Sequence, residues 1–170
     1  SINVISIHTA QDVCEEGNAE TLAELFGMSD VSIFANSVDN FGAGRKGTIN
    51  KISPADFKKD VENKLNTKII RTNECFNEIK EIQNIAVLPG SGTQFIDEII
   101  DSVDVFITGD ISHRYLLKAD DAKLGLIQVG HISTEIPGMK KFVKKLEKEL
   151  NLKLNYCLLY TSPSPRDQLQ

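Results

Sequence analysis

The sequence contains no tryptophan, only three cysteines and five prolines, and no long run of apolar residues. A transmembrane helix needs about 20 consecutive apolar residues, so none is expected. The cysteines, Cys14, Cys75 and Cys157, are odd in number and far apart, which is typical of a reducing compartment rather than of a disulfide framework. We therefore expect a cytoplasmic protein. No cysteine pair has zinc-site spacing, so any metal site must use histidine and carboxylate side chains.

The sequence also has no excess of basic residues over acidic ones. The 170 residues include 19 Lys and Arg against 24 Asp and Glu, which gives a net charge of -5. Proteins that bind nucleic acids usually carry a basic patch that neutralises phosphates, and this balance gives no strong signal of that kind. Apolar residues make up 41% of the chain, enough to bury a core. The length suits one domain or two small lobes, since domains contain about 100–200 residues.

Hydrophobic periodicity predicts strands that alternate with helices. In the first part, strands are expected at 2–7, 31–35, 48–52 and 68–71, helices at 18–26 and 54–65, and a glycine-rich turn at 39–47. In the second part, strands are expected at 85–88, 105–108 and 126–129, and helices at 95–102, 112–118 and 137–150. Pro137 disfavours a helical residue before it, so a continuous helix across residues 131–138 is not expected. Strands separated by helices imply βαβ crossovers and a largely parallel sheet in this part.

These elements predict an α/β fold with mixed to parallel sheets. The periodicity weakens near residues 72–84, so we expect residues 1–72 to be the remainder of one α/β lobe and 73–155 to be a second lobe with a closing helix. The last residues, 156–170, include Ser-Pro-Ser-Pro and are expected to be a non-native extended tail without function. A proline-rich docking tail is the alternative. Because Ser1 directly precedes a predicted strand, we expect the chain to be a fragment.

All three histidines follow predicted strands: His8 after INVISI, His113 after VFITGD and His131 after LIQVG. Ligands of open α/β sheets bind outside the carboxyl ends of the strands. Each histidine also has a carboxylate nearby in sequence, namely Asp12, Asp110 and Glu135 respectively. Imidazole and carboxylate groups together suit Zn, Fe, Mn or Ni. A single histidine in such a place is more often one that merely caps a loop, but the repeated pattern favours a site between the two halves.

Two glycine-containing segments are candidate anion sites. PGSGTQF, which includes Gly90, Ser91 and Gly92, could direct backbone N–H groups at a phosphate. It lacks both the full dinucleotide pattern and the Walker lysine, and a tight strand-to-helix turn explains it as well. FGAGRKG places Arg45 on a predicted turn, where it could bind an anion or simply be solvated.

Five segments in a fixed order are specific enough to indicate a family: IHTAQDVCEEGNAETLAELFG, FGAGRKG, VLPGSGTQFI, VDVFITGDISHR and LIQVGHISTEIPGMKKF. Over residues 2–155 they resemble the dinuclear metal centre hexameric proteins, also called Nif-three-like proteins or GTP cyclohydrolase I type 2 homologs. This resemblance implies two α/β lobes that face each other across two divalent metal ions, and a homohexamer.

The resemblance also assigns metal ligands. Asp12 matches a metal-binding Asp, and His131 and Glu135 match a metal-binding His and a bridging Glu. The family carries an adjacent His pair in an earlier segment, and this chain has none. Each ion normally needs at least three protein ligands. We therefore expect an incomplete site here, with weak metal binding or none.

Other residues are implied to line the pocket. His8 corresponds to a pocket histidine, and Asp110 and His113 belong to the TGDISH loop. Arg114 stands where the family commonly has a further His, which puts an acid–base role at that position in doubt.

The resemblance implies a metal-dependent hydrolase that acts on a nucleotide-like or phosphate-containing substrate, with a metal-bound water as the nucleophile. It assigns no other catalytic group, and kinship of fold does not establish a reaction. One alternative is a non-catalytic, metal-binding hexameric scaffold or adaptor. Another is a metal-free nucleotide-binding lobe that uses the PGSG loop.

Overall fold

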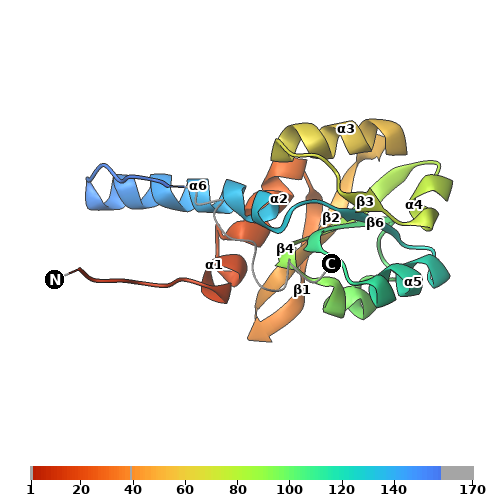
Figure 1. Ribbon diagram of the computed structural model, residues 1–170, viewed down its shortest axis with the longest axis horizontal. Coiled ribbons are helices and arrows are strands. Elements are labelled where there is room, and N and C mark those ends of the chain that lie inside the picture. Colours follow the sequence, from red (N-terminus) through yellow and green to blue (C-terminus); the bar gives the residue numbers. More distant parts are fainter. Residues whose placement is uncertain (1, 39, 158–170) are drawn as a thin grey trace.

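The computed structural model describes residues 2–38 and 40–157. Within these residues the strands form a single six-stranded sheet in the order β1-β2-β4-β5-β6-β3 (Figure 1). The strands are β1 (Ser29–Val38), β2 (Phe41–Ile52), β3 (Arg71–Thr72), β4 (Ile82–Ser91), β5 (Val105–Asp110) and β6 (Gly125–Gln128). Strands β4, β5 and β6 are parallel, whereas β1, β2 and β3 pair antiparallel with their neighbours. The predicted α/β class with a mixed to parallel sheet is confirmed.

Helices occupy most of the connections. They are α1 (Thr9–Val13), α2 (Asn18–Phe26), α3 (Pro54–Leu65), α4 (Glu74–Glu78), the 3-10 helix η1 (Thr93–Glu98), α5 (His113–Asp121) and α6 (His131–Leu150). Local chemistry sets the ends of the predicted helices α2 and α3. Gly27, at φ 67°, stops α2, because a left-handed residue ends a helix with little strain when it is glycine. Ser53 caps α3 by accepting a hydrogen bond from the Asp56 N–H at 3.2 Å.

The parallel strands are buried on both faces, which explains their continuous apolar sequences. In β4, Ile85 and Val87 pack on one side with apolar residues of α2, α3 and α4. Ala86 and Leu88 point to the other side, where they pack with residues of η1 and α5. The molecule therefore has helices on both faces of one sheet, as Figure 1 shows.

The sheet crosses the boundary predicted near residues 72–84. Strand β2 pairs with β4, and β3 pairs with β6, so elements from both sides of the boundary share one sheet. Residues 158–170, which make up most of the predicted tail, lie outside the described residues.

Three predictions about local structure are wrong. Residues 2–7 are extended but form no strand, and Ile2, Val4 and Ile5 are at least 85% exposed. A strand needs a neighbour, and no described strand pairs with this segment. The glycine-rich stretch at 39–47 lies mainly inside β2, because pairing with both β1 and β4 overrides its turn preference. The predicted helix at 95–102 is instead the shorter η1.

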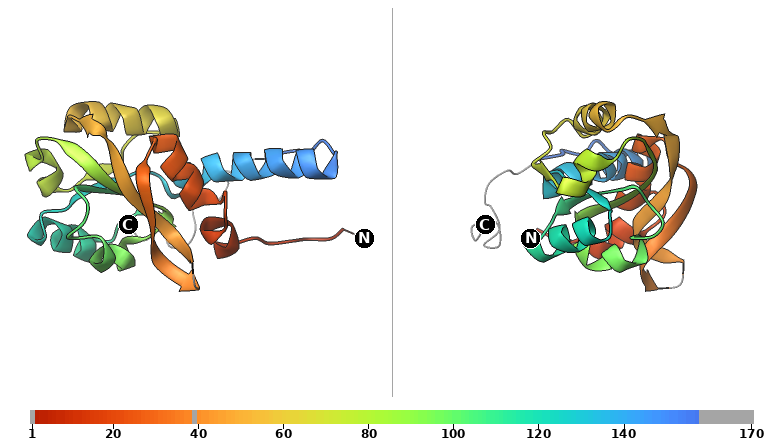
Figure 2. Two further views of the ribbon diagram at one scale, coloured as in Figure 1. Left: turned by 180° about the vertical axis from the view of Figure 1, so that it is seen from behind. Right: turned by 90° about the vertical axis from the view of Figure 1, so that its right-hand side faces the viewer.

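The last helix also differs from the prediction, because α6 runs unbroken from His131 through Pro137. A proline within a helix removes one backbone hydrogen bond, here to the Ser133 carbonyl. Packing of α6 on α2 compensates: a Cβ added at Gly138 would lie 2.1 Å from Asn18 Oδ1, so the two helices are in close contact. The distal part of α6 then extends out of the body on the same side as residues 2–7 (Figure 2). No described helix is long and apolar enough to span a membrane.

We expect Pro137→Ala to increase the free energy of unfolding by about 1–3 kcal/mol, because alanine restores the missing N–H donor within α6. Urea unfolding followed by circular dichroism measures the change. Lys144→Ala, at an exposed position of the same helix, is the control and should change stability by less than about 0.5 kcal/mol. An unchanged or lower stability of Pro137→Ala would show that the proline ring itself stabilises the helix.

Candidate functional site

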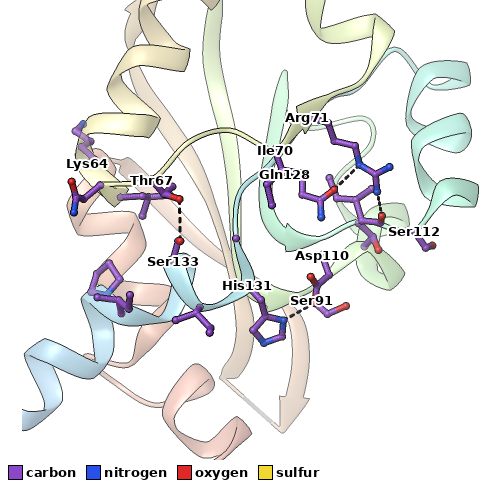
Figure 3. A pocket seen from close by; sticks show the side chains of 18 of the residues that line it. Lys64, Thr67, Ile70, Arg71, Ser91, Asp110, Ser112, Gln128, His131 and Ser133 are labelled. Atoms are coloured by element: carbon purple, nitrogen blue, oxygen red, sulfur yellow. Dashed lines mark hydrogen bonds and ion pairs between the residues drawn. The ribbon is translucent and has the colours of Figure 1, made fainter. Parts of the chain in front are cut away.

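A cavity of about 1350 Å³ lies at the carboxyl ends of the parallel strands. Its lining includes Ser91 at the end of β4, Asp110 at the end of β5 and Gln128 at the end of β6. His131, the first residue of α6, points toward Asp110 at one edge of this cavity (Figure 3). The site therefore occupies the position at which open α/β sheets bind ligands.

His131 is held between two carboxylates. Its Nδ1 lies 2.5 Å from Asp110 Oδ2, and its Nε2 lies 3.1 Å from Glu135 Oε1. Because α6 is continuous here, His131 and Glu135 are one helical turn apart and share a face. Hydrogen bonds to Asp110 first, and then to Glu135, raise the pKa of His131 to about 10. In the metal-free protein the ring is therefore an imidazolium at neutral pH.

Buried hydrogen bonds fix this part of α6 against β4 and β5. The Gly90 N–H donates to Thr134 Oγ1 at 2.8 Å, and the Thr134 hydroxyl in turn donates to the His131 carbonyl at 2.6 Å. The Thr108 hydroxyl donates to the Gly90 carbonyl at 3.3 Å. Thr134 and Thr108 are fully buried, so these bonds are shielded from water.

Two glycines allow the close approach of the helix. Gly90 has φ +69°, and a Cβ built there would lie 3.1 Å from both Glu135 Oε1 and His131 Nε2. A Cβ at Gly109 would lie 2.6 Å from the His131 Cα atom and 2.5 Å from the Gly90 carbonyl oxygen, both of which are backbone atoms. Side chains at these positions would displace the His131–Glu135 pair.

Asp12, in α1, lies near the same groups. Asn18 Nδ2 donates to Asp12 Oδ1 at 2.8 Å and so links the carboxylate to the start of α2. Burial is the main cause that raises the pKa of Asp12, and the nearby Glu135 carboxylate raises it further. His8 and His131 act in the opposite direction, so both rings are close enough to interact with Asp12.

The side chains around His131 supply some of the ligands that a metal ion would need. An imidazole that ligates a metal usually has its second nitrogen bound to a carboxylate, which is the position of Asp110 on Nδ1. His131 Nε2 and Glu135 Oε1 would then be two adjacent ligands. Among the described residues, however, no three His, Cys, Asp or Glu side chains are close enough to hold an ion. Asp12, whose carboxylate interacts electrostatically with both His131 and Glu135, is a candidate for the third ligand and would have to move toward the pair.

The structure does not bring the other predicted pocket residues into contact with the His131–Glu135 pair. Arg114 lines the cavity, and its guanidinium lies 4.5 Å from the Tyr115 ring centroid. His113 begins α5 and is exposed, but it is not among the lining residues. His8 is exposed, and its Nδ1 lies 2.7 Å from Thr9 Oγ1.

The predicted anion-binding groups are used for other contacts. The Gly90 N–H is bonded to Thr134 and is not available to a phosphate. Gly92 directly precedes η1, and an added Cβ there would lie 2.5 Å from a Leu88 side-chain carbon. Arg45 is 5% exposed and donates to the carbonyls of Gly42 and Gly44. Of the predicted anion-binding residues, Ser91 alone lines the cavity.

Several site residues were missed from the sequence. Arg71 donates through Nε to Gln128 Oε1 at 2.5 Å and through its terminal nitrogen to the Ile111 carbonyl, which joins β3 to the loop after β5. Asn18 and Thr134 position Asp12 and His131. A polar residue at the end of an apolar strand was a usable signal for Gln128. The contacts of Arg71, Asn18 and Thr134 depend on pairs 6 to 57 residues apart or on a helix start that Pro137 was expected to exclude.

The fold and site define an α/β protein with a His–carboxylate cluster beside a cavity at the strand ends. The profile of the family Duf34/NIF3 (NGG1p interacting factor 3) matches residues 1–165, and the chain belongs to this family. A GTP cyclohydrolase 1 type 2 homolog from Nostoc sp. is 30% identical over 157 residues, which are 89% of this chain and 58% of the relative. A protein of the same description from Methanocaldococcus jannaschii is 31% identical and is covered over 61% of its length.

Solved structures agree with this assignment. Reduced HcgD from M. jannaschii superposes with a TM-score of 0.71 at 28% identity, over 86% of this chain and 57% of that one. A Staphylococcus aureus hypothetical protein, SA1388, has a TM-score of 0.77 at 24% identity, over 96% and 68%, and supports the fold alone. The chain thus spans less than two thirds of the length of the curated relatives named above.

We expect Gly90→Ala to lower the free energy of unfolding and to alter the His131 resonances, because the new methyl group would press on His131 and Glu135. Proton NMR of the histidine ring and urea unfolding measure the two effects. Gly27→Ala is a matched control: Gly27 has φ +67°, but no atom lies within 4 Å of its added Cβ. Both substitutions should destabilise by about 1 kcal/mol or more through backbone strain. If the His131 resonances are unchanged in Gly90→Ala, the close contact is not what positions the ring.

We expect His131 to titrate near pH 10 in metal-free protein, far above its ordinary value of 6.5. Since the folded pKa is the higher one, this stabilisation is complete below about pH 6.5 and is lost as the pH rises through 10. Histidine NMR titration in the presence of a chelator measures the midpoint. Asp110→Asn should lower it substantially, whereas Asp97→Asn, which removes an exposed partner of Lys118, should not. An ordinary midpoint in the unsubstituted protein would contradict the double pairing.

Proposed function

We propose that this chain contributes the His131, Glu135 and Asp12 ligands of a dinuclear metal centre. We propose further that the complete protein is a metal-dependent hydrolase of phosphate-containing or nucleotide-like substrates. The observation that supports the proposal most strongly is the His131 ring, held by Asp110 on one nitrogen and facing Glu135 with the other. A bound ion would supply a Lewis acid and an activated water next to the cavity.

Electrostatics around Asp12 supports the same proposal. Glu135 is close enough to Asp12 to disfavour ionisation of the Asp12 carboxylate, which is also partly buried. A divalent cation between them would remove this repulsion and would lower the pKa of Asp12. In such a site Asp110 would keep His131 in the tautomer that offers Nε2, and Asn18 would hold Asp12 in place.

An assembly role is the second candidate, and one observation favours it. Ile2, Val4 and Ile5 are almost fully exposed in an extended segment, and Leu150 and Leu152 are more than half exposed near the end of α6. Exposed apolar side chains, here on two segments that extend from the same side of the body, are typical of surfaces that bind a protein partner. A homohexameric, metal-binding scaffold would use such surfaces without catalysis.

Metal binding can be tested by titrating Mn²⁺ into isotope-labelled protein, since paramagnetic broadening detects weak binding. We expect selective loss of signals around Asp12, His131 and Glu135, and release of protons as His131 becomes neutral. Glu135→Gln should weaken binding at least about tenfold. Glu149→Gln, on an exposed part of the same helix, should have no effect. Broadening that is absent, or that centres elsewhere, would reject the ligand assignment.

Hydrolysis is tested separately with a panel of nucleotides and phosphodiesters, by measuring phosphate release with and without a chelator. Release that the chelator abolishes, and that Glu135→Gln abolishes too, supports the enzyme. Metal binding without turnover, together with a stable oligomer in light scattering, supports the scaffold.

A further inference from the structure

Arg71 is a cation in the wall of the cavity that has no charged partner. Its side chain is partly buried and is held by two neutral acceptors: Nε donates to Gln128 Oε1 at 2.5 Å, and a terminal nitrogen donates to the Ile111 carbonyl. It forms no ion pair with any Asp or Glu that the structure describes, and Asp110 of the same cavity pairs with His131 instead. A guanidinium that is partly withdrawn from water and lacks a counter-ion favours an anionic ligand.

Gln128 has an unused donor at the same place. The residue is 4% exposed and lines the cavity at the end of β6. Its Oε1 accepts the hydrogen bond from Arg71, which fixes the orientation of the amide, and its Nε2 bonds to none of the described residues. Among those residues the only fully sealed side-chain atom without a partner is Asn18 Oδ1, so Gln128 Nε2 reaches the open space of the cavity. A donor on so deeply buried a side chain requires a partner from outside the chain.

Printed contacts bring these donors together with a third one. Arg71 and Gln128 are opposite each other in the pairing of β3 with β6 and are joined by the 2.5 Å bond. The Ile111 carbonyl that accepts from Arg71 directly precedes Ser112, whose hydroxyl caps no N–H group of α5. In the close view Arg71 and Gln128 point toward each other, with Ser112 beside them (Figure 3). The three side chains therefore form one cluster of donors.

An apolar side chain adjoins this cluster. The Ile70 N–H donates to the Gln128 carbonyl at 2.8 Å, so Ile70 lies next to the donors. Its side chain is 61% exposed and lines the cavity. An exposed isoleucine beside polar groups in a concave site favours a ligand that has an apolar part next to its charged group.

We propose that Arg71, Gln128 and Ser112 bind the carboxylate of a small organic acid, whose apolar part lies on Ile70. A carboxylate accepts hydrogen bonds through both of its oxygens in one plane, which suits a guanidinium and a primary amide side by side. The one positive charge of the cluster, on Arg71, matches a singly charged group. This proposal goes beyond the metal-dependent hydrolysis proposed above, since it uses none of the proposed metal ligands and needs no metal ion.

The test is an NMR titration of the isotope-labelled full chain with benzoate, in the presence of a chelator. We expect benzoate to shift the side-chain amide signals of Gln128 and the Nε–H signal of Arg71, and to bind less tightly as salt is raised. Benzamide, which is the neutral analogue of the same shape, should not bind. Acetate has no apolar ring and should bind about threefold more weakly or less tightly still.

Three substitutions test the assigned contacts. Arg71→Lys keeps the charge but loses the planar fork, and it should weaken benzoate binding at least about tenfold. Gln128→Glu keeps the shape of the side chain and its bond to Arg71, so the chain should fold, but it neutralises the cation and should abolish binding. Ile70→Ser, at an exposed position, should weaken benzoate about threefold and leave acetate unchanged.

Matched controls lie in the same cavity. Arg114→Lys changes another lining arginine, and Gln94→Glu adds the same charge at a lining glutamine whose amide bonds to the Ser91 carbonyl rather than to Arg71. Both should change benzoate affinity by less than about twofold. No benzoate binding, equal binding of benzamide, tighter binding of phenyl phosphate, or control effects equal to those of Arg71→Lys and Gln128→Glu would each overturn the proposal. Because the titration contains a chelator, its outcome is independent of whether Mn²⁺ binds near His131.

Discussion

The site depends on the close contact between the start of α6 and the ends of β4 and β5. His131 reaches both Asp110 and Glu135 only because the helix begins at that residue and approaches the backbone of Gly90. Thr134 ties the two elements together through a fully buried hydroxyl. A loss of any of these contacts would move a ring nitrogen away from its carboxylate, since the i,i+4 geometry is rigid and the glycine contact has no spare space.

This geometry brings several carboxylates close to one another. Asp110 and Glu135 contact one imidazole at the cavity edge, Asp12 lies nearby, and the burial of Asp12 makes its ionisation costly. A protonated His131 balances part of this negative charge in the metal-free protein, and a divalent cation would balance more of it. Competition between proton and metal for the same ring nitrogen is the expected chemistry of such a cluster.

Opposite charge lies a short way along the same cavity. Positive side chains from α3, β3, α5 and α6 face a surface whose apolar part comes from Ile70 and Ile132.

Much of this could be predicted from local sequence. The α/β class, the α2 and α3 boundaries at Gly27 and Ser53, and the buried parallel strands follow from short-range rules, because caps and periodicity act within a few residues. The order of motifs indicated the family, and the His131–Glu135 spacing indicated a pair. Tertiary structure decided the rest. It kept α6 helical through Pro137, placed the glycines of 42–47 within a strand, and left residues 2–7 without a partner strand. These outcomes depend on packing between segments far apart in the chain. The contacts of Gly90 with Thr134 and of Arg71 with Gln128 are of the same kind. The energy of such tertiary packing exceeds the local conformational preferences that a sequence pattern can express.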